Sequence, residues 1–261
     1  MGGGVIRAVI FDLDGTLVET EELKALSYAR AASELRPGID ETEVIEGFKD
    51  LVGRSREEVA TGLVGRFGLE EAARGRADGT TAEAPWQAFV RVRLGIYEEL
   101  LADDKVVLAH RYPHNIALLH DLRRAYPVGL ATMSHRVQAW RVLLILGLTD
   151  VFEVVATRDD VEHPKPDPEI DLLAARYLGA PPGECLVIED SPAGVAAGLA
   201  ADMDVIAVTT ALTREKFRNT DLLDRCWVVD DPEDLPDVVR RRIEAHEREK
   251  HGGARAERAR K

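Results

Sequence analysis

The sequence predicts an α/β fold, in which a doubly wound, mostly parallel sheet carries an inserted helical domain. Short β-branched runs alternate with stretches whose apolar residues recur about every 3.6 positions, the pattern of consecutive βα units. More than a hundred residues separate the first run from the second, whereas later runs follow at the spacing of single βα units. The predicted strands are residues 5–11, 128–131, 154–156, 186–189, 205–208 and 228–230, with helices at 137–146 and 170–178.

The long gap after the first strand predicts a separate helical unit. Residues 19–35, 41–52, 56–67 and 86–101 have mainly amphipathic helical patterns, and residues 72–85 form a loop rich in Gly, Ala and Thr. We therefore predict a Rossmann-like core from residues 1–18 and 102–239 and a helical cap at 19–101. Hinges are expected at Glu19-Thr20 and at residues 101–105. Residues 240–261 are predicted to be a charged tail, a solvated helix end that frays into disorder after Gly252-Gly253.

Composition limits the partners that the chain can bind. The 261 residues include 34 Lys and Arg against 47 Asp and Glu, a formal net charge of −13, so no global basic field exists to hold a nucleic acid. The basic excess is confined to residues 240–261, whose net charge of +5 leaves −18 on the remainder. No stretch approaches the ~20 apolar residues of a membrane-spanning helix. We expect no nucleic-acid or membrane partner, and a monomer or weak homodimer.

The small number of cysteines indicates the redox state of the cellular compartment. Cys185 and Cys226 are the two cysteines of the chain, too few for a disulfide framework, and each adjoins an apolar run that predicts an interior strand. The N-terminus has no long apolar segment of the kind that a secretory leader contains. We therefore expect a reducing, cytoplasmic setting.

Two carboxylates follow the first predicted strand, at the edge where parallel sheets bind their ligands. The motif Asp12-Leu13-Asp14-Gly15-Thr16 puts both beside a tight turn. The alternative is an Asx-type turn that happens to contain two aspartates. A calcium-binding EF-hand loop is excluded, because Thr16 and Leu17 stand where that loop needs an acidic or amide residue and a glycine.

Hydroxyl groups follow the second predicted strand. Thr132, Met133 and Ser134 precede a helix, and hydroxyls with free backbone N–H groups at a helix N-terminus can bind an anion. Ordinary capping of that helix by Ser134 is the alternative.

The third and fourth groups are a lysine and an acidic pair. Lys165 lies in His163-Pro164-Lys165-Pro166-Asp167-Pro168, where the prolines would present it rigidly at the mouth of a helix, unless it is an ordinary surface lysine. Glu189 and Asp190 end an apolar run just before Ser191-Pro192. They are either site residues or acidic caps of the following helix.

In their order and spacing, these groups resemble the motifs of the haloacid dehalogenase superfamily of phosphohydrolases and mutases, over roughly residues 5–230. The insert resembles that family's C1-type cap, and the chain is similar to the subfamily of β-phosphoglucomutase and its phosphatase relatives. The resemblance makes Asp14 a mark of phosphoryl transfer rather than dehalogenation. The matching positions are Asp12-Leu13-Asp14-Gly15-Thr16, Thr132, Lys165 and Glu189-Asp190-Ser191.

The resemblance implies a reaction in two steps with Mg²⁺. Asp12 would attack phosphorus to give an aspartyl-phosphate, and Asp14 would protonate the leaving alcohol and then activate water. Mg²⁺ would be held by Asp12, Asp190 and the main-chain carbonyl of Asp14, with Glu189 as a ligand or the neighbour of one. Lys165 would neutralise phosphate charge and keep Asp12 ionised. The remaining phosphate oxygens would be bound by Thr132, Met133 and Ser134 through a side-chain hydroxyl and main-chain N–H groups.

Three basic residues of the cap are candidates for substrate recognition. Arg56 matches a cap arginine that contacts a substrate phosphate in β-phosphoglucomutases, although a solvated arginine at a helix start is the alternative. Lys24 and Arg93 are further candidates. Lys24 stands where the mutase has a histidine, and Leu94 follows Arg93 where a mutase-like Lys-Asn pair is expected. Both departures favour a phosphatase, which needs only water at the intermediate.

The sequence therefore predicts a Mg²⁺-dependent phosphatase of a small phosphorylated metabolite, expected to be a sugar phosphate. A β-phosphoglucomutase-type phosphosugar mutase is the first alternative. A non-catalytic binding module on the same fold is the second. Loss of Asp12 or Asp14 would indicate such a module, and both residues are present.

Overall fold

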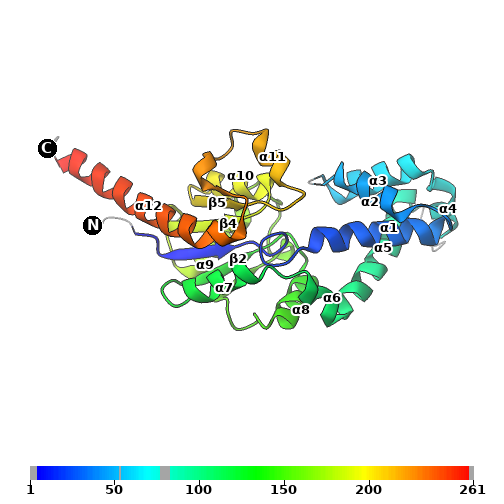
Figure 1. Cartoon of the computed structure of the whole chain (residues 1–261), viewed down its shortest axis with the longest axis horizontal. Coiled ribbons are helices and arrows are strands. Elements are labelled where there is room, and N and C mark those ends of the chain that lie inside the picture. Colours follow the sequence, from blue (N-terminus) through cyan, green and yellow to red (C-terminus); the bar gives the residue numbers. More distant parts are fainter. Residues whose placement is uncertain (1–4, 53, 77–82, 259–261) are drawn as a thin grey trace. The chain divides into compact units, whose positions relative to one another are not determined.

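The computed structural model describes residues 5–52, 54–76 and 83–258. The chain divides into two compact units, one formed by Met1–Val18 with Arg111–Lys261 and the other by Glu19–His110 (Figure 1). The first contains all the strands of the described chain, and the second is helical. Within the described residues, no helix is both long and apolar enough to cross a bilayer.

The first unit is built on a six-stranded sheet in the order β3-β2-β1-β4-β5-β6, with every pairing parallel. This confirms the predicted fold class. β1 lies near the centre, where its Ile10 pairs with Gly129 of β2 and Val187 of β4. All four residues of β1 are buried, as expected for a parallel strand covered on both faces. The strands are β1 (Ala8–Phe11), β2 (Val128–Ala131), β3 (Val154–Ala156), β4 (Cys185–Glu189), β5 (Asp204–Val208) and β6 (Val228–Val229).

Helices connect the strands and cover the sheet. One apolar cluster joins Ile10 and Val187 of the sheet to Ile170 and Ala174 of α9 and Val195 of α10, so these two helices cover one sheet face. The α-helices of this unit are α7 (Pro113–Leu122), α8 (Arg136–Leu146), α9 (Glu169–Leu178), α10 (Pro192–Ala200), α11 (Arg214–Arg218) and α12 (Leu235–Arg258). Short 3₁₀ turns are η1 (Arg158–Asp160), η2 (Pro182–Glu184), η3 (Arg225–Trp227) and η4 (Pro232–Asp234).

The C-terminal segment differs from its prediction. Helix α12 continues to Arg258, past Gly252-Gly253 where fraying was expected, whereas residues 259–261 lie outside the described part. Asp204 at the start of β5 accepts hydrogen bonds from Arg242 (2.5 Å) and His246 (2.8 Å), and the Arg242 guanidinium lies 4.9 Å from the centre of the Trp227 ring. These contacts fix the first half of the segment, because the half-buried carboxylate of Asp204 needs the donors that the helix supplies.

The second unit is a helical domain with its own core. Tyr28 lies at its centre, with its ring 5.4 Å from that of Phe48 and 5.6 Å from that of Phe89. Its helices are α1 (Thr20–Leu35), α2 (Glu41–Lys49), α3 (Arg56–Phe67), α4 (Glu70–Gly75), α5 (Pro85–Ala102) and α6 (Asp104–Ala109). Helix α4 occupies the start of the segment predicted as a loop, and residues 77–82 of that loop lie outside the described part. Six residues are too few to show a helical period.

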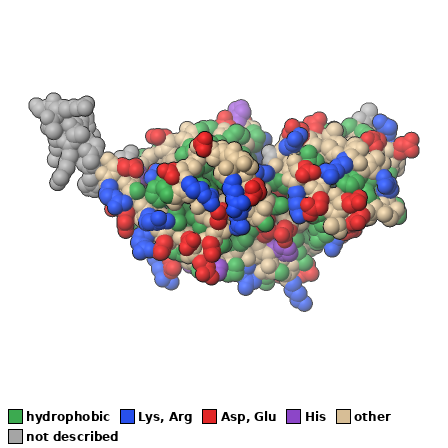
Figure 2. All heavy atoms as spheres, turned by 45° about the horizontal axis from the view of Figure 1, so that its top comes forward, with side chains coloured by type: hydrophobic (Ala, Val, Ile, Leu, Met, Phe, Trp, Pro, Cys, Tyr) green, Lys and Arg blue, Asp and Glu red, His purple; other side chains and the backbone are tan. Residues whose placement is uncertain are grey.

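The surface seen in Figure 2 carries charged side chains of both signs. On the face seen in Figure 2, acidic and basic side chains lie interspersed rather than gathered into one basic area. Both cysteines are free: Cys185 is buried at the start of β4, and Cys226 is exposed in η3 rather than in a strand.

Candidate active site

A tight turn at Gly15 follows the two aspartates that come after β1. The Asp12 N–H donates to Ile188 O of β4 (3.0 Å), so the chain leaves the sheet only after Asp12. Gly15 then adopts a left-handed conformation (φ 78°) that a residue with a side chain rarely accepts. The buried amide of Asn115 donates to Thr16 O (2.6 Å) and holds the turn against α7. Asp12 is consequently buried, and Asp14 is half-buried.

The side chain of Lys165 is buried in the site, so Lys165 is not an ordinary surface lysine. Its side chain is 5% exposed, and its ammonium has three hydrogen-bond acceptors. They are Asp12 Oδ1 (3.0 Å), Ala131 O (2.9 Å) and Glu189 Oε1 (2.8 Å). The lysine therefore links the carboxyl ends of β1, β2 and β4, with its three donors all used.

The hydroxyls after β2 bind Asp14. Thr132 Oγ1 lies 3.2 Å and Ser134 Oγ 2.7 Å from Asp14 Oδ2, and the Ser134 N–H donates to Thr132 Oγ1 (3.1 Å). Ser134 does not cap α8, because the N-cap position is His135. The side chain of Met133 packs against the apolar cluster beside α9, which leaves its backbone as the part that could meet an anion. Both aspartates thus bond to residues more than a hundred positions away, which an isolated Asx turn does not explain.

A cluster of carboxylates surrounds the end of β1. Asp12, Glu189 and Asp190 are all buried, and each offers an oxygen within 4.8 Å of the other two. Glu189 also accepts from the Ser191 N–H (2.6 Å) and the Ser191 hydroxyl (3.0 Å). Ser191 is the side-chain cap of α10, through the Gly194 N–H (3.1 Å), so the acids do not serve as its caps.

Two glycines make room for this cluster. A Cβ atom on Gly15 would lie 2.2 Å from Asp190 Oδ2, and one on Gly194 would lie 1.8 Å from Glu189 Oε1. Both distances are far shorter than any contact between these atoms. Gly15 belongs to the opening motif, but nothing in the apolar sequence of α10 indicates that Gly194 borders the site.

The electrostatics of the site favour a cation. Burial raises the pKa of Asp12, Lys165 acts in the opposite direction, and Glu189 and Asp14 raise it further. Burial lowers the pKa of Lys165, but the contacts with Asp12 and Glu189 outweigh burial and leave it well above its ordinary value. Clustered carboxylates outnumber the single lysine, and hard oxygen ligands of this kind suit Mg²⁺. The donor set therefore fits the metal that the sequence predicts.

Comparison with known proteins agrees with this geometry. A family model described as a haloacid dehalogenase-like hydrolase matches residues 6–202. The chain belongs to the haloacid dehalogenase-like hydrolase family. It is therefore an enzyme, and the predicted family and fold are confirmed.

Some of the proteins that this hydrolase resembles carry phosphatase or mutase names. It is 31% identical to the protein CbbY of Rhodobacter capsulatus over 80% of this chain and 88% of that one. It is 30% identical to hexitol phosphatase A of Escherichia coli over 83% of this chain and 89% of that one. The crystal structure of β-phosphoglucomutase from Clostridium difficile superposes with a TM-score of 0.66 at 25% identity, covering 92% of this chain and 98% of that one.

The cap of the hydrolase gathers the three predicted basic residues around one tyrosine. Arg93 is 5% exposed, with its guanidinium 4.9 Å from the ring centre of Tyr28 and 4.4 Å from that of Tyr97. Burial raises the pKa of Tyr28, and the charges of Arg93, Arg56 and Lys24 oppose it. All three cations therefore act on the same phenol group.

Arg56 and Lys24 differ in their setting. Arg56 is the exposed first residue of α3, whose N-terminus is capped by Ser55 and Glu58 in a reciprocal capping box, so the helix start does not need the arginine. Lys24 donates to Glu21 within α1 (2.6 Å).

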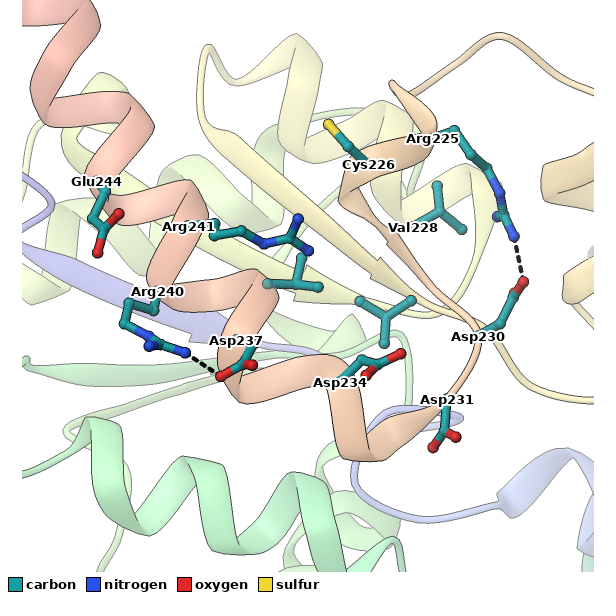
Figure 3. A pocket seen from close by; sticks show the side chains of 12 residues that line it. Arg225, Cys226, Val228, Asp230, Asp231, Asp234, Asp237, Arg240, Arg241 and Glu244 are labelled. Atoms are coloured by element: carbon teal, nitrogen blue, oxygen red, sulfur yellow. Dashed lines mark hydrogen bonds and ion pairs between the residues drawn. The ribbon is translucent and has the colours of Figure 1, made fainter.

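A hollow of about 640 Å³ lies elsewhere on the hydrolase core, beside β6, η3 and the first turns of α12 (Figure 3). None of the predicted site residues lines it. Two of its three arginines form ion pairs within the hollow, Arg225 with Asp230 and Arg240 with Asp237, as the dashed lines in Figure 3 mark. Its lining has five acidic residues against three arginines, and this net negative charge disfavours a phosphate, so the hollow does not compete with the carboxylate site.

Proposed function

We propose that this hydrolase is a Mg²⁺-dependent phosphatase that acts on a small phosphorylated metabolite, a sugar phosphate, through an aspartyl-phosphate. The observation that carries the proposal is the buried Asp12 carboxylate, which Lys165 holds at 3.0 Å while Asp14 follows two residues later. The name of hexitol phosphatase A supports a sugar-phosphate substrate. A screen of phosphorylated metabolites for phosphate release with Mg²⁺ tests it directly, and failure on every sugar phosphate would reject the substrate class.

Asp12 is the proposed nucleophile. Phosphoryl transfer needs an attacking oxygen in line with the leaving oxygen, and positive charge that offsets the phosphoryl oxygens. The Lys165 ammonium fixes one oxygen of Asp12, so the other can point to phosphorus. Because Lys165 is itself held by Ala131 and Glu189, the carboxylate is oriented before the substrate arrives.

Asp14 is the proposed proton carrier. The hydroxyls of Thr132 and Ser134 donate to the same oxygen of Asp14, which fixes the carboxyl group in one orientation. We propose that these hydroxyls turn to the phosphate oxygens when substrate binds, together with the N–H groups of Met133 and Ser134. Asp14 then protonates the leaving alcohol in the first step and takes a proton from water in the second.

Mg²⁺ fits the carboxylates of Asp12 and Asp190 and the main-chain carbonyl of Asp14. When bound, it supplies positive charge that offsets the phosphoryl oxygens. Glu189 uses both of its oxygens on Lys165 and Ser191. We therefore favour Glu189 as a residue next to the metal ligands that holds Lys165 and Ser191, the N-cap residue of α10, in place.

Removal of metal is expected to abolish activity. Excess EDTA should stop turnover and added Mg²⁺ should restore it, because the acidic cluster needs a cation to bind a phosphate anion. Asp190→Asn should weaken Mg²⁺ binding, measured by equilibrium dialysis, on the order of 10-fold or more while the circular dichroism spectrum stays unchanged. Asp221→Asn, at an exposed position, is the matched control. Full turnover in EDTA would contradict the metal assignment.

Arg56 is expected to read a second polar or anionic group of the substrate. Arg56→Ala should lower kcat/KM for the natural substrate on the order of 10²-fold, the loss of a charged and partly desolvated contact. Hydrolysis of p-nitrophenyl phosphate should be nearly unchanged, because that compound has no such group. Arg54→Ala, also exposed, should leave both rates near wild type. Equal losses on the two substrates would make Arg56 a structural residue of the cap, and we would then look to Lys24 and Arg93.

The second candidate function is a phosphosugar mutase of the β-phosphoglucomutase type, favoured by the structural match to that enzyme. A mutase needs a bisphosphate activator and hydrolyses its aspartyl-phosphate slowly. In this chain Lys24, paired with Glu21, stands where the mutase has a histidine. Conversion of a phosphosugar without release of phosphate would favour the mutase.

A further inference from the structure

Helix α9, which follows the loop of Lys165, contains a buried acid that the proposed mechanism does not use. Asp171 is the third residue of α9 and is fully buried. Neither of its carboxyl oxygens has a hydrogen-bond partner within the described part of the chain. Its neighbours Ile170, Ala174 and Ala175 belong to the apolar cluster under the sheet. An apolar residue would pack at this position without the penalty of burying an unpaired polar group.

Two charged groups act on Asp171, one on each neighbouring segment. Burial raises the pKa of Asp171 to about 6, Lys165 in the loop before α9 opposes the shift, and Glu189 on β4 adds to it. Asp171 in turn helps to raise the pKa of Lys165. The carboxyl group is therefore mostly ionised at neutral pH, close enough to Lys165 to act on it through space.

The position on the helix does not account for this acid. Carboxylates in the first turn of a helix are favourable, but the gain is small and is normally made at the surface. Lys165 does not need Asp171 to remain charged either, because Asp12 and Glu189 contact its ammonium directly. What Asp171 adds is a further buried negative charge that acts on the lysine.

We propose that Asp171 is a positioning residue that acts through Lys165: its buried negative charge weakens the attraction between Lys165 and phosphate, so that inorganic phosphate leaves the site faster. The inference rests on the proposed phosphatase function, and it concerns product release and not the chemical steps. Without the charge of Asp171, only the carboxylates of the site would offset the positive charge of Lys165. Such a site would bind the phosphate product more tightly than the wild-type site does.

The test is the affinity of inorganic phosphate for the Asp171→Asn variant. Asparagine keeps the shape of the side chain and removes its charge. At pH 7.5 with Mg²⁺, the Kd for phosphate, measured by calorimetry and as a product-inhibition constant, should fall by roughly 3- to 10-fold. KM should fall with it and kcat should not rise. At pH 5, where wild-type Asp171 is mostly protonated, the two proteins should bind phosphate with similar affinity.

Controls separate this role from a structural one. Asp167→Asn removes an exposed charge two residues from Lys165 and keeps the oxygen that accepts from the Glu169 N–H, so phosphate affinity should not change. Asp171→Leu also lacks the charge and should bind phosphate as tightly as the asparagine variant. It guards against failure of either variant to fold.

Stability gives an independent readout. Because the pKa of Asp171 is raised in the folded protein, its carboxyl group holds a proton more tightly there than in the unfolded chain. The wild-type protein therefore loses stability as the pH rises from about 4 to 6. Asp171→Asn should thus have a Tm higher by a few degrees at pH 7.5 and nearly equal at pH 4. Unchanged phosphate affinity at pH 7.5 in both variants of an active phosphatase would overturn this inference alone. A wild-type protein that releases no phosphate from any substrate would instead reject the proposed function.

Discussion

Asp12→Asn is expected to lower kcat by about 10⁴-fold or more without unfolding the protein. The amide cannot attack phosphorus to form a stable acyl phosphate, so the covalent route is lost. Folding should survive, because asparagine keeps the side-chain shape and Lys165 retains Ala131 O and Glu189 as acceptors. Steady-state turnover of the best substrate from the metabolite screen measures the loss, and thermal unfolding checks the fold.

A trapping experiment makes the same prediction sharper. Wild type mixed with ³²P-labelled substrate and quenched in acid should retain label that hydroxylamine removes, as expected of an acyl phosphate, and Asp12→Asn should retain none. The variant should still bind substrate, because the other phosphate ligands are intact. Asp121→Asn, an exposed position, serves as the control for general effects of the substitution. Turnover by Asp12→Asn at the wild-type rate would contradict the nucleophile assignment.

The sheet could be predicted because its strands are short, apolar and separated by helical patterns. The strands at 128–131 and 154–156 agree with the structure residue for residue. The first strand begins at Ala8 rather than at residue 5, where Val5 is 43% exposed. Apolar character alone does not distinguish the residues of a buried strand from an exposed apolar residue that precedes it.

The groups of the candidate site could be predicted from their place after the strands, because parallel strands bring their carboxyl ends to one edge. Their contacts could not. Lys165 lies 153 positions from Asp12 in the sequence, and only the fold reveals that its ammonium contacts both Asp12 and Glu189. Ser134 had an ordinary capping interpretation, yet its hydroxyl donates to Asp14. Gly194 gave no signal, because its role is to leave space for Glu189.

Two helical segments departed from the prediction for opposite reasons. Helix α4 is too short to show a period, and it forms where Leu69, fully buried, anchors the chain after Gly68 ends α3. Helix α12 continues through a charged tail that was expected to fray after Gly252-Gly253. There Arg242 and His246 find a common acceptor in Asp204, which is distant in sequence. Charge runs indicate disorder only where no such partner exists in the fold.

Asp14→Asn is expected to have an effect that depends on the leaving group. With an alkyl phosphate, such as a sugar phosphate, the alcohol must be protonated as it leaves, so kcat/KM should fall by about 10²- to 10⁴-fold. With p-nitrophenyl phosphate the leaving group needs no proton, so phosphorylation of Asp12 should continue. Hydrolysis of the intermediate still needs a base, and labelled phosphoenzyme should therefore accumulate, with a burst of nitrophenol followed by slow turnover.

The two hydroxyls that hold Asp14 give this prediction a graded control. Ser134→Ala removes the shorter of the two hydrogen bonds to Asp14 Oδ2 and leaves the one from Thr132. It should lower kcat/KM for the sugar phosphate by roughly 10-fold, the loss expected for one hydrogen bond to a charged group. Because this variant keeps the carboxyl group of Asp14, Ser134→Ala should accumulate no phosphoenzyme. If Asp14→Asn lost activity equally on both substrates and showed no burst, Asp14 would be a residue that supports the metal or the turn. Proton transfer would then have to be assigned elsewhere.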